Sequence, residues 1–238
     1  MAKGCTKKEG VDFKQVFSPV VRHTSIKVLL AMIAVYDMEL DQLDVKTAFL
    51  HGILQKEILM VQPEGYVDLE RPERVCLLKK SLYSLKQSPR QWYLRFDEFI
   101  TINRFKRCSF DCCIYYKLLK THLYIYLLLY VDDMLIACKL RDGIEALKEL
   151  LSSEFDIKDL EHARKILGMN IRRNMKEGTM FLLQENYVKK IVKTFGMSVC
   201  KSVMTPLASH FKLYNMQCAK TDEERHEMAK FPYANVVG

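Results

Sequence analysis

The chain has 238 residues, of which 49% are hydrophobic and 28% are charged, as in an ordinary soluble globular protein. A chain of this length buries about 70–75% of the surface that it exposes when unfolded, which is enough for one large domain or two small ones. Its formal net charge of +8 favours a polyanionic partner such as nucleic acid, and the alternative is a basic surface on an unrelated enzyme.

Missing motifs argue against several classes of protein. The eight Cys residues form no C-x-x-C pair and no zinc-knuckle spacing, and we see no secretory leader, so reduced thiols in an intracellular protein are expected. The phosphate-binding G-x-x-x-x-G-K-[ST] and dinucleotide-binding G-x-G-x-x-G motifs are absent, as are G-x-S-x-G and H-E-x-x-H. The apolar run 123–131 is too short for a membrane-spanning helix, which needs about 20 residues, so no membrane partner is expected.

The first third of the chain predicts one helix followed by strands. The segment "TSIKVLLAMIAVYD" favours a buried helix from about Ser25 to Tyr36, capped by Thr24 or Ser25. A short strand is expected around Asp44, in "DQLDVKTAFLHG". Two more strands are predicted within 57–67 and 74–85, because turn-rich residues separate two β-favouring runs.

The middle of the chain predicts a helix and then three strands joined by hairpins. In "SPRQWYLRFDEFITINRF", Ser88 is the expected cap, Pro89 occupies the first turn and Trp92 belongs to the core. Three strand-like runs follow, at 112–120, 122–130 and 134–138. Asp132 and Asp133 then lie at the second bend.

The last third predicts two further helices around a hairpin. The helices are expected at about 143–155 and 185–197, and the hairpin within 165–184 turns at residues 176–178. Residues of the second helix expected to face inward are Tyr187, Ile191 and Phe195. After Pro206 the sequence is polar and predicts a linker or tail. Helices mixed with hairpin-linked strands indicate an α+β fold with an antiparallel sheet.

Two adjacent acids, Asp132 and Asp133, stand inside the otherwise apolar stretch "LYIYLLLYVDDMLIACK". Burying a carboxylate costs several kcal/mol, to order of magnitude, unless it is solvated, paired or bound to metal. An exposed turn is the simplest explanation, because Asp favours turns. Proton sharing between the two is disfavoured, because adjacent residues of a strand point to opposite faces. A divalent cation is the third explanation, since such ions take hard oxygen ligands.

A third acid favours the metal. Asp44 lies at an expected strand end in "QLDVKTAF", 88 residues before Asp132. If the two strands are neighbours, their carboxylates converge in the arrangement used for two-metal phosphoryl transfer. A basic protein that holds a nucleic-acid template and primer fits the same chemistry.

Six blocks extend along nearly the whole chain: "SPVVRHTSIKVLLAMIA", "QLDVKTAFLHG", "VCLLKKSLYSLKQSPRQWY", "LLLYVDDMLIA", "FDIKDLEHARKILGMNI" and "MSVCKSVMTPL". In order and approximate spacing they resemble the reverse transcriptase domain of copia-type LTR retrotransposon Pol polyproteins. The resemblance implies a right-hand, palm-type polymerase domain with partial fingers and a thumb-like C-terminal part.

The resemblance also implies a catalytic triad. The acid of the "LDVK-AF" block and the two acids of YVDD carry over to Asp44, Asp132 and Asp133, as catalytic residues and metal ligands. Asp44 and Asp132 are the implied bridging ligands, and the carbonyl of Val45 is an additional one. The implied cofactor is a pair of Mg²⁺ ions, with Mn²⁺ as the alternative.

Other residues match blocks that contact the nucleotide or the primer. Phe49 stands where the family keeps a ring that excludes a ribose 2′-hydroxyl, and a plain core aromatic is the alternative. Gln87 is the implied nucleotide contact, and Lys86 and Arg90 are basic candidates that could equally be solvated charges. The primer-positioning hairpin corresponds to Leu167, Gly168 and Met169, with an ordinary hairpin as the alternative.

Departures from the family pattern are also visible. Ser84 and Glu161 stand where many members have Gly, and a side chain strains a turn that needs positive φ. Lys3 is the only remnant of a basic strand expected upstream. The expected division is a reverse transcriptase domain over 1–206, thumb-like from about 160, followed by a linker or truncated connection over 207–238.

The sequence therefore predicts an RNA-directed DNA polymerase that uses an RNA template, a DNA or RNA primer and deoxynucleoside triphosphates. Cytoplasmic particles or the nucleus are the expected locations. The alternatives are a catalytically inactive, truncated retroelement relic that at most binds nucleic acid, and a metal-dependent nuclease that uses the same acids. An acid/base glycosidase is more remote, because such enzymes hold two separated carboxylates and need no basic surface.

Overall fold

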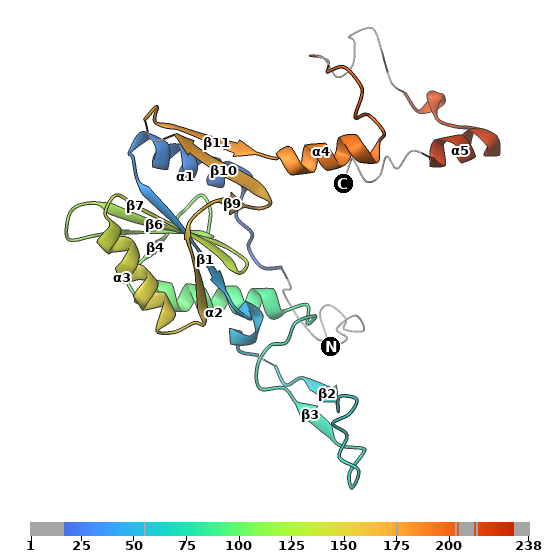
Figure 1. Ribbon diagram of the computed structural model, residues 1–238. Coiled ribbons are helices and arrows are strands. Elements are labelled where there is room, and N and C mark those ends of the chain that lie inside the picture. Colours follow the sequence, from blue (N-terminus) through green and yellow to red (C-terminus); the bar gives the residue numbers. More distant parts are fainter. Residues whose placement is uncertain are drawn as a thin grey trace. The chain divides into compact units, whose positions relative to one another are not determined.

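The computed structural model in Figure 1 describes residues 17–54, 56–174, 176–202, 204, 212 and 214–230. The chain divides into two compact units. The first comprises Met1–Leu167 with Ile171–Phe181, and the second comprises Gly168–Asn170 with Leu182–Gly238. Lys3 and Pro206 lie outside the described residues. The expected domain boundary near residue 206 therefore stays a prediction.

Six strands form the main sheet of the first unit, in the order β4-β5-β6-β7-β1-β8 (Figure 1). Every neighbouring pair is antiparallel. The strands are β1 Glu39–Val45, β4 Lys106–Arg107, β5 Ile114–Leu118, β6 Tyr124–Tyr130, β7 Asp133–Cys138 and β8 Ile157–His162. The predicted combination of helices with an antiparallel sheet is confirmed.

Helices cover the two faces of this sheet differently. On one face α2 (Ser88–Ile102) packs Phe96 against Tyr115 of β5, with ring centroids 5.8 Å apart. On the same face α3 (Arg141–Ser152) approaches β7 so closely that a Cβ on Gly143 would lie 3.0 Å from the Sγ of Cys138. On the opposite face α1 (His23–Val35) borders β6, where Leu29 and Tyr126 line a cavity of about 420 Å³.

Shorter elements complete the described chain. A two-stranded sheet pairs β2 with β3, and a three-stranded sheet has the order β11-β10-β9. Their bounds are β2 Leu59–Val61, β3 Val75–Leu77, β9 Lys165–Ile166, β10 Met169–Asn174 and β11 Thr179–Leu183. The remaining helices are η1 Ala48–His51, α4 Glu185–Thr194, η2 Asn215–Gln217 and α5 Asp222–Ala229. The strands predicted within 57–67 and 74–85 therefore exist but are much shorter than their apolar runs.

A buried ionic cluster joins β1, α3 and β8, and sequence reasoning missed it. The Asp41 side chain is completely buried, and its carboxylate lies 2.6 Å from the Nζ of Lys148 and 2.9 Å from the guanidinium of Arg141. Lys148 also contacts Asp159 at 2.7 Å, and His162 lies 3.1 Å from Asp41. Burial alone would raise the pKa of Asp41, but the hydrogen bonds and charges of Lys148 and Arg141 outweigh it and lower that pKa.

Two predicted helix caps are wrong. Neither Thr24 nor Ser25 caps α1, because the helix begins at His23 and its N-cap residue makes no side-chain hydrogen bond. In α2, Ser88 is the first helical residue and not the cap, since its hydroxyl donates to the carbonyl of Leu82 at 2.7 Å. Pro89 does occupy the first turn, as predicted.

Two further differences concern the second unit. None of the described residues of α4 is buried. Tyr187 is 51% exposed, so its predicted inward position is wrong, whereas Ile191 and Phe195 are half-buried. Helix α5 lies where a linker or tail was predicted. Its start is a capping box, in which Thr221 and Glu224 each accept a hydrogen bond from the other's backbone N–H at 3.2 Å. The T-x-x-E signal for this helix was present in the sequence.

Candidate active site

Strands β1 and β7 place two acids opposite each other, near the last residue of β1 and at the first residue of β7. In their antiparallel register Asp44 faces Asp133, and Asp133 faces Tyr130 of β6 on its other side. Cross-strand partners project from the same face of a sheet. The neighbours Leu43 and Val45 point to the opposite face and are buried. The strand that carries the acid of the "LDVK" block and the strand that follows the YVDD turn are therefore neighbours, with Asp44 paired to Asp133 rather than to Asp132.

The turn between β6 and β7 carries the third acid. Val131 has φ 57°, an unusual value for a β-branched residue. Two hydrogen bonds hold this turn: the indole Nε1 of Trp92 donates to the carbonyl of Val131 at 2.6 Å, and the backbone N–H of Val45 donates to the carbonyl of Asp132 at 2.9 Å. The second bond ties the YVDD turn directly to the end of β1.

The electrostatics of the three acids are those of a partly buried anionic cluster. Burial raises the pKa of Asp133, a hydrogen bond from Gln42 at 3.1 Å opposes that rise, and the charges of Asp132 and Asp44 add to it. In the part of the chain that the structure describes, no ion pair includes Asp44, Asp132 or Asp133. The ion pairs nearest in sequence to Asp44 are Asp41–Arg141 and Lys46–Asp156. Like charges directly opposite on neighbouring strands destabilise a sheet.

These residues suit a divalent cation, because carboxylates are the hard oxygen ligands that Mg²⁺ and Mn²⁺ accept, and a cation removes the repulsion between them. The carboxylates of Asp44, Asp132 and Asp133 do not all lie within 4.8 Å of one another. Among the described residues, the trio whose ligand atoms all lie within 4.8 Å of one another is Asp111, Cys112 and Cys113.

That trio has a structural role. The carboxylate of Asp111 accepts hydrogen bonds from the backbone N–H groups of Arg22 and Cys113, at 2.9 and 3.0 Å. Burial strongly raises the pKa of the Cys113 thiol, which opposes the thiolate form that metals bind.

A pair of rings lies beside the acids. Phe49 of η1 packs against Tyr83 with ring centroids 4.9 Å apart. Burial and the charges of Asp132 and Asp44 raise the pKa of the Tyr83 hydroxyl, which places this ring within the electrostatic field of the acids. Sequence reasoning singled out Phe49 and missed Tyr83, although Tyr83 stands in the same "SLYSLKQSP" block.

The turn that presents Tyr83 has a positive φ at Ser84, a conformation that costs free energy for any residue other than Gly. The backbone N–H of Leu85 donates to the carbonyl of Leu82 at 3.3 Å, and Ser84 has φ 77° at the third position. A positive φ there is the pattern of a type II turn, which favours Gly. Glu161 likewise has φ 58°. Both positions at which the sequence analysis expected Gly therefore lie in the left-handed region.

The predicted nucleotide-contacting residues have different environments. Gln87 immediately precedes α2, is 8% exposed, and its buried Oε1 has no hydrogen-bond partner among the described residues. Arg90 is partly exposed and donates to the carbonyl of Phe17 at 3.3 Å. Lys86 forms an interaction within the structure. A role for these three in nucleotide binding stays a prediction.

The predicted primer-positioning segment is a turn between β9 and β10. Leu167 has φ 51° and Gly168 has φ 73°, so the backbone is left-handed at two consecutive residues. Met169 begins β10. Primer positioning by this segment stays a prediction.

Comparison with known proteins bears on the whole chain. The family model for "Reverse transcriptase (RNA-dependent DNA polymerase)" matches residues 1–209. A retrovirus-related Pol polyprotein from transposon TNT 1-94 of Nicotiana tabacum is 48% identical over all 238 residues, and that from transposon RE2 of Arabidopsis thaliana is 35% identical over 213 residues, or 90% of this chain.

The chain spans 18% of the tobacco polyprotein and 14% of the Arabidopsis one. No solved structure matches the chain. Within the described residues, no helix is long and apolar enough to cross a membrane. The predicted resemblance is confirmed, and the chain belongs to the reverse transcriptase (RNA-dependent DNA polymerase) family, as found in copia-type Pol polyproteins of transposons.

Proposed function

We propose that the chain is the polymerase domain of a retrotransposon Pol polyprotein and extends a DNA or RNA primer along an RNA template with deoxynucleoside triphosphates. The observation that carries this proposal is the cluster of acids at β1 and β7, where Asp44 faces Asp133, and where burial together with the charges of Asp132 and Asp44 raises the pKa of Asp133. Membership of the reverse transcriptase family supports the same reaction.

In this proposal Asp44 and Asp132 are the main ligands of two divalent cations, Mg²⁺ or Mn²⁺, with Asp133 and the carbonyl of Val45 beside them. When bound, the two cations activate a primer 3′-hydroxyl and neutralise charge on the triphosphate during in-line displacement. The chain holds its carboxylates through the contacts described above, from Gln42 to Asp133 and from the Val45 N–H to the Asp132 carbonyl.

Substrate selection is assigned to the surroundings of the acids. Phe49, packed on Tyr83, excludes a ribose 2′-hydroxyl. Gln87 offers its Oε1, which has no partner among the described residues, to the incoming nucleotide, and Lys86 and Arg90 contribute positive charge near it. Residues 167–169 position the primer end.

The main sheet is the proposed palm, with partial fingers. The thumb-like part begins near residue 160, the domain extends to residue 206 and 207–238 form a linker. As a retrotransposon polymerase, the protein would work in cytoplasmic particles or the nucleus.

Primer extension on oligo(dT)-primed poly(rA) with Mg²⁺ and dTTP tests the proposal. We expect extension by the native chain, no extension by Asp132→Asn and native extension by Glu149→Gln, which removes an exposed carboxylate from α3 as a matched control. Shortening of the labelled primer would instead identify a nuclease. If none of the folded proteins extends the primer, the remaining interpretation is an inactive relic, which at most binds nucleic acid.

A further inference from the structure

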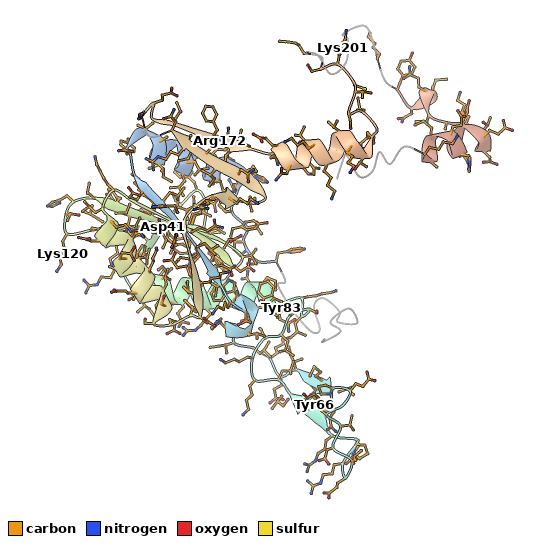
Figure 2. All side chains as sticks on the ribbon, in the orientation of Figure 1. Asp41, Tyr66, Tyr83, Lys120, Arg172 and Lys201 are labelled. Carbon is orange, nitrogen blue, oxygen red and sulfur yellow. The ribbon has the colours of Figure 1, made fainter. Side chains whose placement is uncertain are left out.

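A basic cavity of about 560 Å³ lies at the outer edge of the main sheet, beside β4, β5 and the start of β6. Its lining includes four cationic side chains and two rings: Arg104, Lys106, Lys117, Lys120, Tyr116 and Tyr124. Lys120 marks this edge in Figure 2, on the opposite side of the first unit from Tyr83.

This cavity is separate from the candidate active site. In the β6–β7 register Tyr130 faces Asp133, and Tyr124 lies six residues earlier on the same strand. At about 3.3 Å per residue, the two ends of β6 are about 20 Å apart. A ligand in the cavity therefore contacts none of the three acids directly.

The cations of the cavity have no acidic partner in the part of the chain that the structure describes. None of its described lining residues is Asp or Glu, and none of the ion pairs found among the described residues includes its four cations. Lys117 is held in place, because its Nζ donates to the carbonyl of Asn103 at 3.1 Å and lies 5.2 Å from the ring of Phe105. Four like charges around one cavity repel each other and favour an anionic ligand with several charges.

The rings of the cavity form an aromatic platform. Tyr124 is 44% exposed, and its ring lies 6.1 Å from those of Tyr116 and Tyr126, centroid to centroid. Beside this platform β4 is only two residues long and pairs with β5 at Tyr115 and Tyr116, which leaves the rest of β5 without that neighbour. An exposed ring flanked by cations can stack on a nucleobase while the cations contact phosphates.

We propose that this edge is a second nucleic-acid site, which binds an unpaired strand by stacking one base on Tyr124 and by contacts from Lys120, Lys106 and Arg104 to phosphates. An unpaired strand is favoured over a duplex, because the base faces of a duplex are already stacked on one another. The site needs no metal and no polymerase activity, so it stands apart from the function proposed above.

Fluorescence anisotropy of the full chain with labelled oligo(dT) or oligo(rA) in EDTA tests this site. We expect Tyr124→Ala to weaken binding about tenfold, the loss typical of one stacked base, while Tyr124→Phe keeps the ring and native affinity. Lys120→Ala should reduce the slope of log K against log salt by about 0.7, the change expected for one lost contact to a single strand. Lys27→Ala, which removes an exposed charge from α1, should leave the slope unchanged.

Ultraviolet crosslinking of the same oligonucleotides should label the peptide that contains Tyr124, as read by mass spectrometry. Native affinity and salt slope in both Tyr124→Ala and Lys120→Ala would overturn the proposal, as would a crosslink confined to other peptides. Two outcomes would show that the ligand is not an unpaired strand. One is that Tyr124→Ala weakens binding of a blunt duplex as much as binding of the oligonucleotide, and the other is that dTMP competes at the oligonucleotide's own concentration.

Discussion

The indole of Trp92, on α2, donates a 2.6 Å hydrogen bond to the carbonyl of Val131, the residue that precedes the two adjacent acids. Trp92 is 1% exposed, so its ring serves the core while its one polar atom holds the YVDD turn. This bond connects the packing of α2 to the placement of Asp132, and it lets the role of the turn be tested without altering an acid.

We expect Trp92→Phe to destabilise the protein by about 2–4 kcal/mol, because the substitution opens a cavity and leaves the buried carbonyl of Val131 unpaired. Urea unfolding measures that loss. Mn²⁺ affinity, followed by electron paramagnetic resonance, should fall as well. Phe96→Leu is the control, since it also reduces core volume but leaves the indole of Trp92 in place to donate to Val131; if both variants bind Mn²⁺ equally, the hydrogen bond does not position the acids.

The raised pKa of Asp133 should appear as a pH-dependent stability of the metal-free protein. Because the folded state holds this proton more tightly than the unfolded state, stability is lost as pH rises from the ordinary value of 3.8 through the raised pKa. Asp133→Asn should remove that loss and unfold at a higher temperature than the native chain at pH 7. Thermal melts in EDTA between pH 4 and 8 measure this, and parallel curves for the two proteins would contradict it.

Mg²⁺ or Mn²⁺ should stabilise the native chain, since a ligand of the folded state at tenfold its Kd adds about 1.4 kcal/mol. Asp44→Asn should lose this gain, because it removes an expected ligand. Glu149→Gln should keep it. Melting temperatures with and without the ion distinguish the cases, and an equal gain in all three proteins would place the ion elsewhere.

Glu161 is a site where glycine should stabilise the protein. It lies in β8 where the pairing with β1 shifts register between Asp41 and Leu43, and its φ is 58°. A bulge residue in the left-handed region favours Gly. We expect Glu161→Gly to raise the free energy of unfolding by about 0.5–1 kcal/mol. Glycine removes the cost of the left-handed conformation, and the greater conformational entropy of glycine in the unfolded chain offsets part of that gain. Glu161→Ala, which keeps a Cβ, should gain nothing; equal urea midpoints for the two variants would refute the argument.

Lys148→Met should destabilise the protein by about 3 kcal/mol, because it leaves the buried carboxylate of Asp41 with fewer partners. The lowered pKa of Asp41 means that the cluster's stabilisation is present above pH 3.8 and is lost as pH falls through the native value. The double variant Asp41→Leu/Lys148→Met removes both charges and should recover most of the loss. Chemical unfolding of the three proteins measures the coupling.

Much of the sheet could be predicted, because local signals suffice for it. The runs around Tyr126 and Ile136 favour strands, and an acid pair between them marks a hairpin bend. That the strand of Asp44 lies beside the acid pair could be inferred only because three acids in apolar surroundings need a common explanation, and the register that pairs Asp44 with Asp133 could not.

Contacts between distant segments could not be read in the same way. Asp41 looks like a solvated strand residue until α3 brings Lys148 against it, and Tyr83 looks like a core ring until its turn faces Phe49. Ser88 failed as a cap because its hydroxyl is engaged by a carbonyl six residues earlier. In each case tertiary packing decided the role of the side chain.

The place of β1 inside the sheet has a consequence for synthesis of the chain. β1 is flanked by β7 and β8, both of which come later in the sequence, and 93 residues separate the end of β1 at Val45 from the end of β7 at Cys138. At about 5–20 residues per second, the ribosome needs about 5–20 s to supply that partner. During this interval β1 has neither of its partners, so the segment that carries Asp44 presents two unpaired edges as it emerges, and unpaired edges favour aggregation.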